Sequence, residues 1–299
     1  ALVAFAEASG AAVTSAYRRQ DTFPNAHAAY IGHLEINRVA FQDRAWAECD
    51  LVIAAGARLD GITTQDFSLI RPDQRLIQIF PDPDVLARWP SNVAFAADVA
   101  PTLAALGKAV KAPAAARLAW RDRVHGEQVE FATPGAIKIQ GKVDLARIVE
   151  HVARLAPRQS VILTDSGTFA RWVHRYYPFE HGRTQAGPIA GAMGYAVPGA
   201  LGAAMARPDV PAIAFVGDGG FLMTGQELTT AAQHRLPLKV IVCDNNAWGS
   251  ILVSQQRAYG AAGEFGTRLE SPDFAMVARG YGLAAYTIVE TGISPTATL

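Results

Sequence analysis

Short apolar runs alternate with helical stretches along the first third of the chain. The strand-like runs cover residues 13–17, 50–56, 75–80 and 92–97, and helical stretches such as 37–48 and 100–110 lie between them. Short, nearly continuous apolar strands separated by helices are typical of a parallel sheet that is covered on both faces. This region is therefore predicted to be a doubly wound α/β domain.

The same alternation restarts after an interruption. From residue 111 the pattern degrades into alanine, proline and charge, and it resumes with the helix and strand pairs 145–155 and 160–165, 195–206 and 211–217, and 225–234 and 238–244. We therefore predict an α/β fold with two doubly wound parallel-sheet domains. The predicted boundaries are 1–112 for the first domain, 113–140 for a linker and 141–299 for the second domain.

Two short patterns predict where helices begin in the second domain. Thr224 and Glu227 have the spacing of a capping box, which predicts a helix start at this point. Ser271, Pro272 and Asp273 are arranged as an N-cap, a first helical residue and a first-turn acid, so a last helix is predicted to follow and to end near Gly280 or Gly282.

Composition and charge exclude several classes of partner. The 299 residues are half hydrophobic and carry 27 basic and 27 acidic side chains, and no basic stripe interrupts the sequence, so neither nucleic acid nor an anionic membrane is an expected partner. Residues 186–206 carry no charge, but five glycines and two prolines predict a tight turn and a closely packed buried helix rather than a membrane span. Cys49 and Cys243 lie in apolar, strand-like runs and are predicted to be buried free thiols of a cytoplasmic protein.

Polar residues follow two consecutive strands of the predicted second domain. Asp218 comes directly after the strand 211–217, and Asn245, 27 positions later, comes after the strand 238–243. Ligands in parallel α/β sheets bind at the carboxyl ends of the strands, so these two residues are expected to face one crevice. Hard oxygen ligands beside glycine amides suit a divalent cation that carries a phosphate. We expect Gly219 and Gly220 to let the backbone approach that anion.

The motif Gly217-Asp218-Gly219 followed at this spacing by Asn245 resembles the signature of thiamine-diphosphate-dependent enzymes. The resemblance is closest to the group of acetolactate synthase, benzoylformate decarboxylase and pyruvate oxidase. Further stretches occur in the order of that family, at 165–172, 187–203, 225–249 and 271–282, and 50–60 and 76–84 resemble its middle domain. Nearly the whole chain is covered.

The resemblance assigns roles to individual positions. It implies that Mg²⁺ is bound by the side chains of Asp218 and Asn245 and by the backbone carbonyl of Ala247. Met193, 25 residues before Asp218, is implied to be the apolar wedge that bends the cofactor, whereas the alternative interpretation from the residues alone is ordinary core filler. The remaining implied cofactor-binding residues are Gly167, Thr168, Phe169, Gly191, Ala192, Gly217, Gly219, Gly220, Trp248 and Gly249.

The resemblance also implies a group that this sequence does not contain. In the family, a catalytic glutamate lies in an N-terminal pyrimidine-binding domain of the partner subunit, and no such domain precedes Ala1. The chain is therefore expected to be a fragment, with an N-terminally truncated middle domain, that is inactive by itself. The full-length protein is expected to be a homodimer or homotetramer that decarboxylates a 2-oxo acid and then protonates the product or joins it to a second carbonyl.

Several alternatives stay open. The full-length protein could be a simple decarboxylase similar to benzoylformate decarboxylase, or a non-catalytic module that retains the cofactor pocket. A nicotinamide-binding dehydrogenase is disfavoured because no strand is followed by G-x-G-x-x-G with an acid about twenty residues on. FAD binding in the first domain has weak support: Gly56-Ala57-Arg58 matches, Gly32-His33-Leu34 matches poorly, and Ile62 replaces the second expected arginine.

Overall fold

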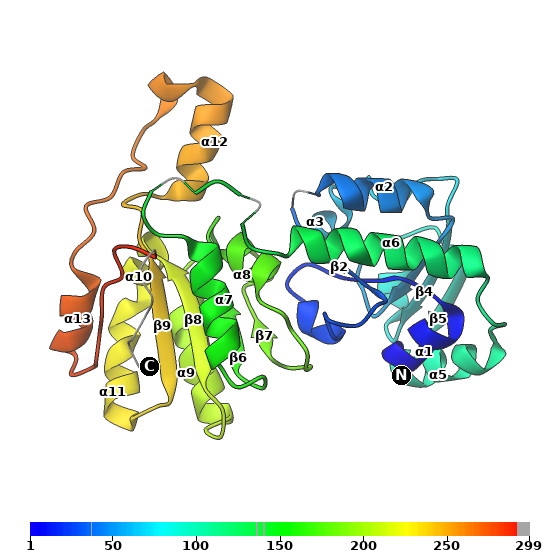
Figure 1. The fold of residues 1–299 in the computed structure, drawn as a ribbon, viewed down its shortest axis with the longest axis horizontal. Coiled ribbons are helices and arrows are strands. Elements are labelled where there is room, and N and C mark those ends of the chain that lie inside the picture. Colours follow the sequence, from blue (N-terminus) through cyan, green and yellow to red (C-terminus); the bar gives the residue numbers. More distant parts are fainter. Residues whose placement is uncertain (37, 136, 140, 292–299) are drawn as a thin grey trace. The chain divides into compact units, whose positions relative to one another are not determined.

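The computed structural model describes residues 1–36, 38–135, 137–139 and 141–291, and the chain divides into two compact units, Ala1–Ala132 and Thr133–Leu299 (Figure 1). Every strand pairing within the sheets is parallel, which confirms the predicted α/β fold. Asn37, the first residue of one predicted helix, lies outside the described residues.

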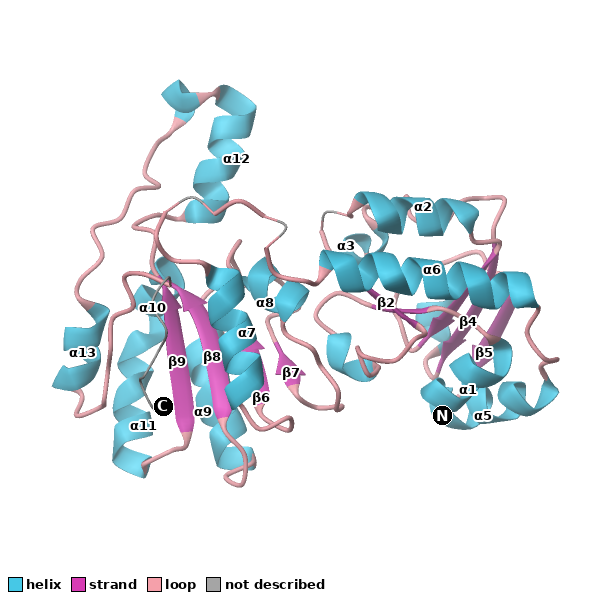
Figure 2. Ribbon diagram, in the orientation of Figure 1, coloured by secondary structure: helices cyan, strands magenta, loops and turns pink. Residues whose placement is uncertain are grey.

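The first unit has two parallel sheets with helices around them (Figure 2). One sheet pairs β1 (Val13–Ser15) with β2 (Tyr30–His33), and the other has the order β3 (Leu51–Ala55), β4 (Arg75–Phe80), β5 (Val93–Ala96). The helices are α1 (Leu2–Ser9), η1 (Gln20–Thr22), α2 (Ala40–Glu48), α3 (Gly61–Thr64), α4 (Pro83–Leu86), α5 (Val99–Ala109) and α6 (Ala115–Phe131). The four predicted strands of this unit are confirmed, and β2 is an additional one.

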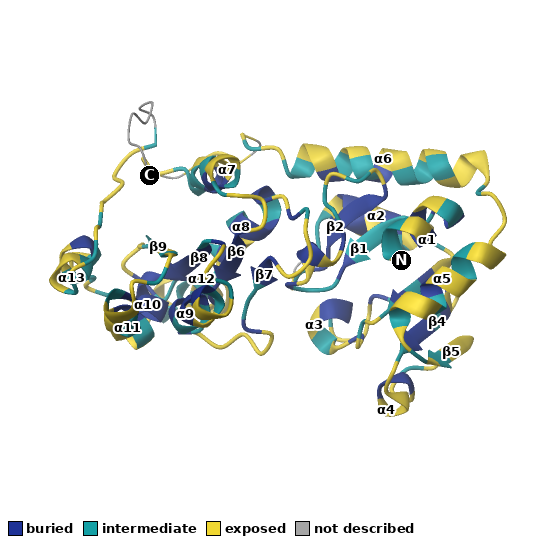
Figure 3. Cartoon of the chain, turned by 90° about the horizontal axis from the view of Figure 1, so that it is seen from below, coloured by how far each residue is buried: buried dark blue, intermediate teal, exposed yellow. Residues whose placement is uncertain are grey.

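Helix α6 occupies most of the range that was predicted to be a linker. Its exposed residues alternate with half-buried ones along its length (Figure 3), and only Val124 and Gln128 are buried. Val124 packs in one cluster with Ile31 of β2 and Phe41 of α2. Contacts with distant segments, rather than a strong apolar periodicity of its own, therefore hold this helix, which explains why its sequence resembles a linker.

Strand β2 depends on the same helix. Gly32 has φ 97°, and a Cβ added to it would lie 2.4 Å from Oε1 of Gln128 in α6. The strand therefore needs a glycine where α6 crosses it, and this glycine interrupts the apolar run that would otherwise predict a strand.

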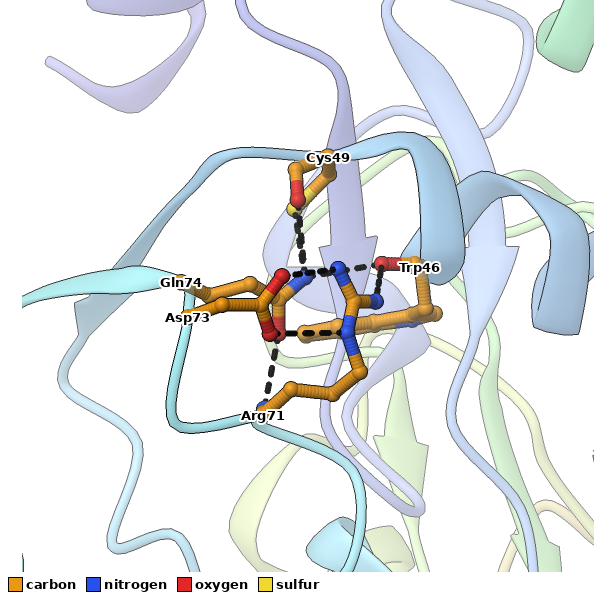
Figure 4. A network of polar contacts seen from close by, with 5 residues as sticks. All are labelled: Trp46, Cys49, Arg71, Asp73 and Gln74. Carbon is orange, nitrogen blue, oxygen red and sulfur yellow. Dashed lines mark hydrogen bonds and ion pairs between the residues drawn. The ribbon is translucent and has the colours of Figure 1, made fainter.

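A polar network fixes the end of α2 beside the start of β4 (Figure 4). Nε2 of Gln74 donates to the backbone carbonyls of Trp46 and Cys49, each at 2.8 Å, and Nη1 of Arg71 donates to the Trp46 carbonyl at 2.9 Å. Arg71 is also paired with Asp73. Cys49 thus follows a helix rather than lying in a strand, and both free cysteines are half-buried rather than buried.

The second unit has one parallel sheet with the order β7 (Gln185–Ala186), β6 (Val161–Thr164), β8 (Ala212–Gly217), β9 (Leu238–Cys243). Strand β8 is buried over its whole length and alternates between two cores. Ala212, Ala214 and Val216 pack with α9, whereas Ile213 and Phe215 pack with α7 and α8. The helices are α7 (Leu145–Leu155), α8 (Ala170–Tyr176), α9 (Ala196–Ala206), α10 (Asp218–Thr224), η2 (Gly225–Glu227), α11 (Leu228–His234), α12 (Gly249–Tyr259), η3 (Ala261–Gly263) and α13 (Phe274–Gly280).

The uncharged stretch 186–206 forms a turn followed by the closely packed helix α9, as predicted. Small side chains of α9, including Ala196, Ala200 and Ala204, are completely buried against the sheet. In the part of the chain that the structure describes, there is no helix with the length and apolarity needed to cross a membrane.

Both predicted helix caps are wrong, although helical residues do begin directly after Thr224. The side chain of Thr224 does not cap a helix: its Oγ1 donates to the carbonyl of Gly194 at 3.1 Å, and the predicted helix 225–234 is divided into η2 and α11. The last helix is capped by Asp273, whose carboxylate accepts from the amide of Met276 at 2.9 Å, rather than by Ser271. The Ser271 hydroxyl instead donates to Asp244 at 2.8 Å.

Candidate functional site

Asp218 lies at the carboxyl end of β8, where it begins α10, and it is only 3% exposed. Its Oδ1 accepts from the amide of Gly219 at 2.8 Å, and its Oδ2 accepts from the amides of Asn245 at 3.2 Å and Ala247 at 3.0 Å. The ends of β8 and β9 are neighbours, since Gly217 is in register with Cys243. The structure therefore brings the three residues of the implied metal-ligand set together.

Burial raises the pKa of Asp218 above the ordinary value for an aspartate. The amide hydrogen bonds from Gly219, Ala247 and Asn245 act in the opposite direction, and the neighbouring Asp244 carboxylate raises the pKa further. A cation beside this carboxylate would favour its ionised form. A bound metal ion would thus stabilise the ionised carboxylate of Asp218 against the effect of its burial.

The loop after β9 offers the other two oxygen ligands. Asn245 is exposed, and its side chain packs closely against Gly249: a Cβ added at Gly249 would lie 2.7 Å from Nδ2 of Asn245. Ala247 is buried, and its carbonyl accepts from the amide of Gly249 at 2.7 Å, which leaves a second lone pair on that oxygen. One carboxylate, one amide oxygen and one carbonyl oxygen are hard ligands of the kind that Mg²⁺ takes, so the donor set fits this ion.

The glycines after Asp218 are required for close packing, in addition to the predicted approach of the backbone to an anion. A Cβ at Gly219 would lie 2.3 Å from Cζ3 of Trp248, and a Cβ at Gly220 would lie 2.3 Å from Oδ2 of Asp165. In the structure the Cβ positions of these glycines face an indole ring and a carboxylate, and the approach of their backbone to an anion stays a prediction. The two glycines therefore allow close packing within the protein.

The turn 167–169 lies beside the same strand end. The ring of Phe169 covers two glycines of this region. A Cβ added at Gly167 would lie 2.5 Å from the ring, and a Cβ added at Gly217 would lie 3.1 Å from it. The amide of Thr168 donates to Oγ of Ser250 at 3.1 Å. This bond joins the turn after β6 to the start of α12, which has no buried residue and extends away from the sheet (Figure 1, orange).

Met193 lies in the turn 191–194 before α9, and not inside the helix. Its side chain is 36% exposed, and Ala192 and Gly191 are exposed as well. Gly191 and Gly194 have φ of 72° and 82°, the left-handed conformation that favours glycine. The interpretation of Met193 as core filler is therefore wrong, while its role as a wedge stays a prediction.

Asp165, to which the sequence assigns no role, is fully buried directly after β6. Its Oδ2 accepts from the amide of Gly194 at 2.8 Å, and its Oδ1 accepts from the amides of Tyr195 at 3.2 Å and Ser166 at 2.9 Å. The available signal was its position, because Asp165 follows its strand as Asp218 follows β8.

The comparisons with known proteins agree over both units. Residues 1–106 match the family model described as "Thiamine pyrophosphate enzyme, central domain", and residues 165–296 match "Thiamine pyrophosphate enzyme, C-terminal TPP binding domain". The acetolactate synthase large subunit of Corynebacterium glutamicum is 31% identical over 97% of this chain and 48% of its own length. The acetolactate synthase isozyme 1 large subunit of Escherichia coli is 31% identical over 87% of this chain and 46% of its own length.

A solved structure supports the same relationship. The thiamine diphosphate-dependent 4-hydroxybenzoylformate decarboxylase of Rhodococcus jostii superposes with a TM-score of 0.75 and 25% identity, over 94% of this chain and 52% of that chain. The chain thus spans about half the length of the relatives that it matches.

Proposed function

Because the chain belongs to the thiamine pyrophosphate enzyme family, we propose that the protein containing it is a Mg²⁺- and thiamine-diphosphate-dependent enzyme that acts on 2-oxo acids, similar to acetolactate synthase. The observation that carries the proposal is the buried carboxylate of Asp218, which accepts amide hydrogen bonds from Asn245 and Ala247 across two neighbouring strand ends. The same three residues supply one oxygen each for a metal ion.

In this proposal the residues of the second unit bind and orient the cofactor. Asp218, Asn245 and the carbonyl of Ala247 hold Mg²⁺, and the backbone around Gly219 and Gly220 lies beside the diphosphate. When bound, thiamine diphosphate supplies the carbanion-stabilising chemistry that breaks the bond next to a 2-oxo group. Met193, exposed in its turn, supports the reactive part of the cofactor through its side chain.

The proposal extends to partners. Met193, Leu222, Met223 and Ile251 of the second unit are all exposed by more than a third, so apolar side chains gather on elements next to the strand ends. Exposed apolar groups of this kind mark surfaces that other protein parts cover. We propose that a pyrimidine-binding domain of the full-length protein, which forms a homodimer or homotetramer, covers them and contributes the catalytic glutamate.

Flavin binding by the first unit remains a prediction of the sequence. Gly56 has φ 72° at the end of β3, and Arg58 is exposed in the loop that follows. Gly32 and His33 belong instead to β2, in the separate β1–β2 sheet. A titration of the full-length protein with FAD, followed by flavin fluorescence, tests this prediction independently of the thiamine site.

A second candidate function is simple decarboxylation without transfer to a second carbonyl. The similarity of this chain to the 4-hydroxybenzoylformate decarboxylase favours it. The two functions are separated by product analysis, because incubation with pyruvate gives acetolactate in one case and the free aldehyde in the other. Exclusive release of aldehyde would replace the leading proposal by the second.

The metal site is tested by substituting Asp218 in the full-length protein. Asp218→Ala should remove detectable calorimetric binding of thiamine diphosphate in the presence of Mg²⁺, because it deletes one ligand and the acceptor that orders the 245–247 loop. Asp273→Ala, which removes the helix cap of α13 in the same unit, is the matched control and should leave binding intact. Micromolar binding retained by Asp218→Ala would overturn the assignment.

A further inference from the structure

Asp165 contacts both ends of the proposed cofactor site, although no part of the proposed function assigns it a role. It follows β6, a strand between β7 and β8 in the sheet, and its own amide donates to the carbonyl of Phe215 in β8 at 3.0 Å. Its backbone is therefore held by the sheet, and its carboxylate is completely buried. Burying a carboxylate in this way costs free energy of folding unless its oxygens accept hydrogen bonds.

The first contact is with the turn that carries Met193. The Asp165 carboxylate accepts from the amides of Gly194 at 2.8 Å and Tyr195 at 3.2 Å, the residues that lead into α9. A negative group at the start of this helix is also favoured by the helix dipole. From the other side, the Thr224 hydroxyl donates to the carbonyl of Gly194 at 3.1 Å. Gly194 is thus fixed through both of its backbone polar groups.

The second contact is with α10, the helix that begins with Asp218. A Cβ at Gly220 would lie 2.3 Å from Oδ2 of Asp165, so the first turn of α10 rests directly against the carboxylate. One side chain therefore touches the turn of Met193 and the turn of Asp218. Since the Met193 side chain is exposed, no core packing determines its position, and the backbone of its neighbour must do so.

We propose that Asp165 is a positioning residue that fixes the turn 191–194 against α10 and so sets the distance between Met193 and Asp218. This inference rests on the proposed function for its meaning in catalysis, but the positioning itself is a property of the chain without ligand. Loss of the carboxylate should loosen the turn while the metal end, which has its own hydrogen bonds, stays ordered.

The test of positioning is hydrogen exchange in the 299-residue chain without cofactor. Asp165→Asn keeps the size of the side chain but replaces one acceptor oxygen by an NH₂ group, which cannot accept from an amide. Gly194 and Tyr195 donate to different oxygens of Asp165, and asparagine keeps only one of them, so at least one of these two amides should exchange about 10-fold faster or more. The control Asp273→Asn, at the cap of α13, should leave exchange in 190–196 unchanged.

Ligand binding by the full-length protein then distinguishes a positioning role of Asp165 from a role in stabilising the fold as a whole. In the presence of Mg²⁺, Asp165→Asn should weaken thiamine diphosphate binding about 10-fold and inorganic diphosphate binding by less than about three-fold, since the second ligand uses only the metal end. Equal losses for both ligands, or unchanged exchange at both Gly194 and Tyr195, would overturn the inference. If the wild-type protein binds neither ligand but the local exchange still changes, the proposed function fails and the positioning role stands.

A second variant covers the case in which Asp165→Asn does not fold. Gly220→Ala keeps the carboxylate but places a methyl group only 2.3 Å from Oδ2, so the carboxylate must shift from its position against Gly194. The same amides should again exchange faster than in the wild-type chain. A folded Gly220→Ala chain with unchanged exchange at Gly194 and Tyr195 would also overturn the inference.

Discussion

Both units place an Asp-Gly pair between a parallel strand and a helix, and the two pairs behave differently. In the first unit Asp60 is exposed, and its carboxylate accepts from the amide of Thr63, three residues along in α3. In the second unit Asp218 is buried and accepts from Asn245 and Ala247, which are 27 and 29 positions away. The first aspartate is a helix cap, and the second joins two strand ends.

A strand-end aspartate is a candidate ligand when its own helix does not use its carboxylate. A local cap is satisfied by its own helix and keeps its charge in water, so it has no reason to bind anything else. A buried carboxylate that distant amides approach is held in place by the tertiary structure, and burial raises its pKa unless a cation is near. Burial and long-range partners, and not the Asp-Gly dipeptide, distinguish the two positions.

Asn245 allows a test of whether the metal site depends on the end of β9 as well as on the end of β8. Asn245→Ala in the full-length protein should weaken Mg²⁺-dependent cofactor binding about 100-fold, because it deletes an implied metal ligand. The neighbouring Asp244→Asn should change binding by less than about three-fold. Its oxygen accepts from the amide of Asn246 at 3.0 Å and from Ser271 at 2.8 Å, and asparagine can do the same. Calorimetric titration measures both, and equal losses would contradict the assignment of Asn245.

Much of the fold followed from local patterns, because buried parallel strands are recognisable one at a time. The strands β4 and β9 and the helix α7 agree with their predicted positions to within a residue. The meeting of Asp218 with Asn245 could also be predicted, since the carboxyl ends of neighbouring parallel strands lie at one edge of the sheet. These features require only the sequence of each element and a general rule of topology.

What could not be predicted depends on contacts between distant segments. Helix α6 and strand β2 support one another through Gln128 and Gly32, and neither has a clear pattern alone. The reason for Gly220 is the carboxylate of Asp165, 55 positions earlier, and a spacing of that length suggests no contact until the sheet order is known. The same applies to Thr224, whose hydroxyl binds Gly194 instead of capping a helix.

The glycines of the two Asp-Gly pairs should differ in how much they matter for stability. Gly219→Ala should reduce the free energy of unfolding by about 2 kcal/mol, because the added methyl would lie 2.3 Å from the ring of Trp248. Gly61→Ala meets its nearest neighbour, Oδ1 of Asp66, at an ordinary 3.5 Å and should instead raise the free energy of unfolding by about 0.5 kcal/mol. Urea denaturation of the two variants measures the difference, and equal effects would show that the two strand ends are packed alike.

The exposed Met193 provides a test of function that does not depend on the metal ligands. Met193→Ala in the full-length protein should slow proton exchange at the thiazolium C2 of bound cofactor about 10-fold, since a poorly supported cofactor is misplaced for the reaction. Affinity should fall less, because Asp218 and Asn245 remain. NMR measures the exchange. As a control, Met205→Ala removes an exposed methionine at the far end of α9. An unchanged exchange rate would leave Met193 without a role in the site.

The two free cysteines extend the comparison to thiol chemistry, with the smallest expected effect. Burial, with a contribution from the Asp218 carboxylate, raises the pKa of Cys243 to about 12. Burial and the charge of Asp50 raise the pKa of Cys49 as well, but a backbone hydrogen bond with Leu51 and the charge of Arg71 offset part of that rise. The reactive form is the thiolate, and its fraction at pH 8 falls about 10-fold for each unit by which the pKa rises. Iodoacetamide at pH 8 should therefore modify Cys49 before Cys243 in the folded chain, as peptide mass spectrometry over time would show.

In Asp218→Asn the loss of the nearby charge should lower the pKa of Cys243 and speed its modification, with no change at Cys49. Modification of both cysteines at one rate would contradict the effect of burial on Cys243, and a Cys243 rate that does not depend on residue 218 would contradict the contribution of the Asp218 carboxylate to its pKa.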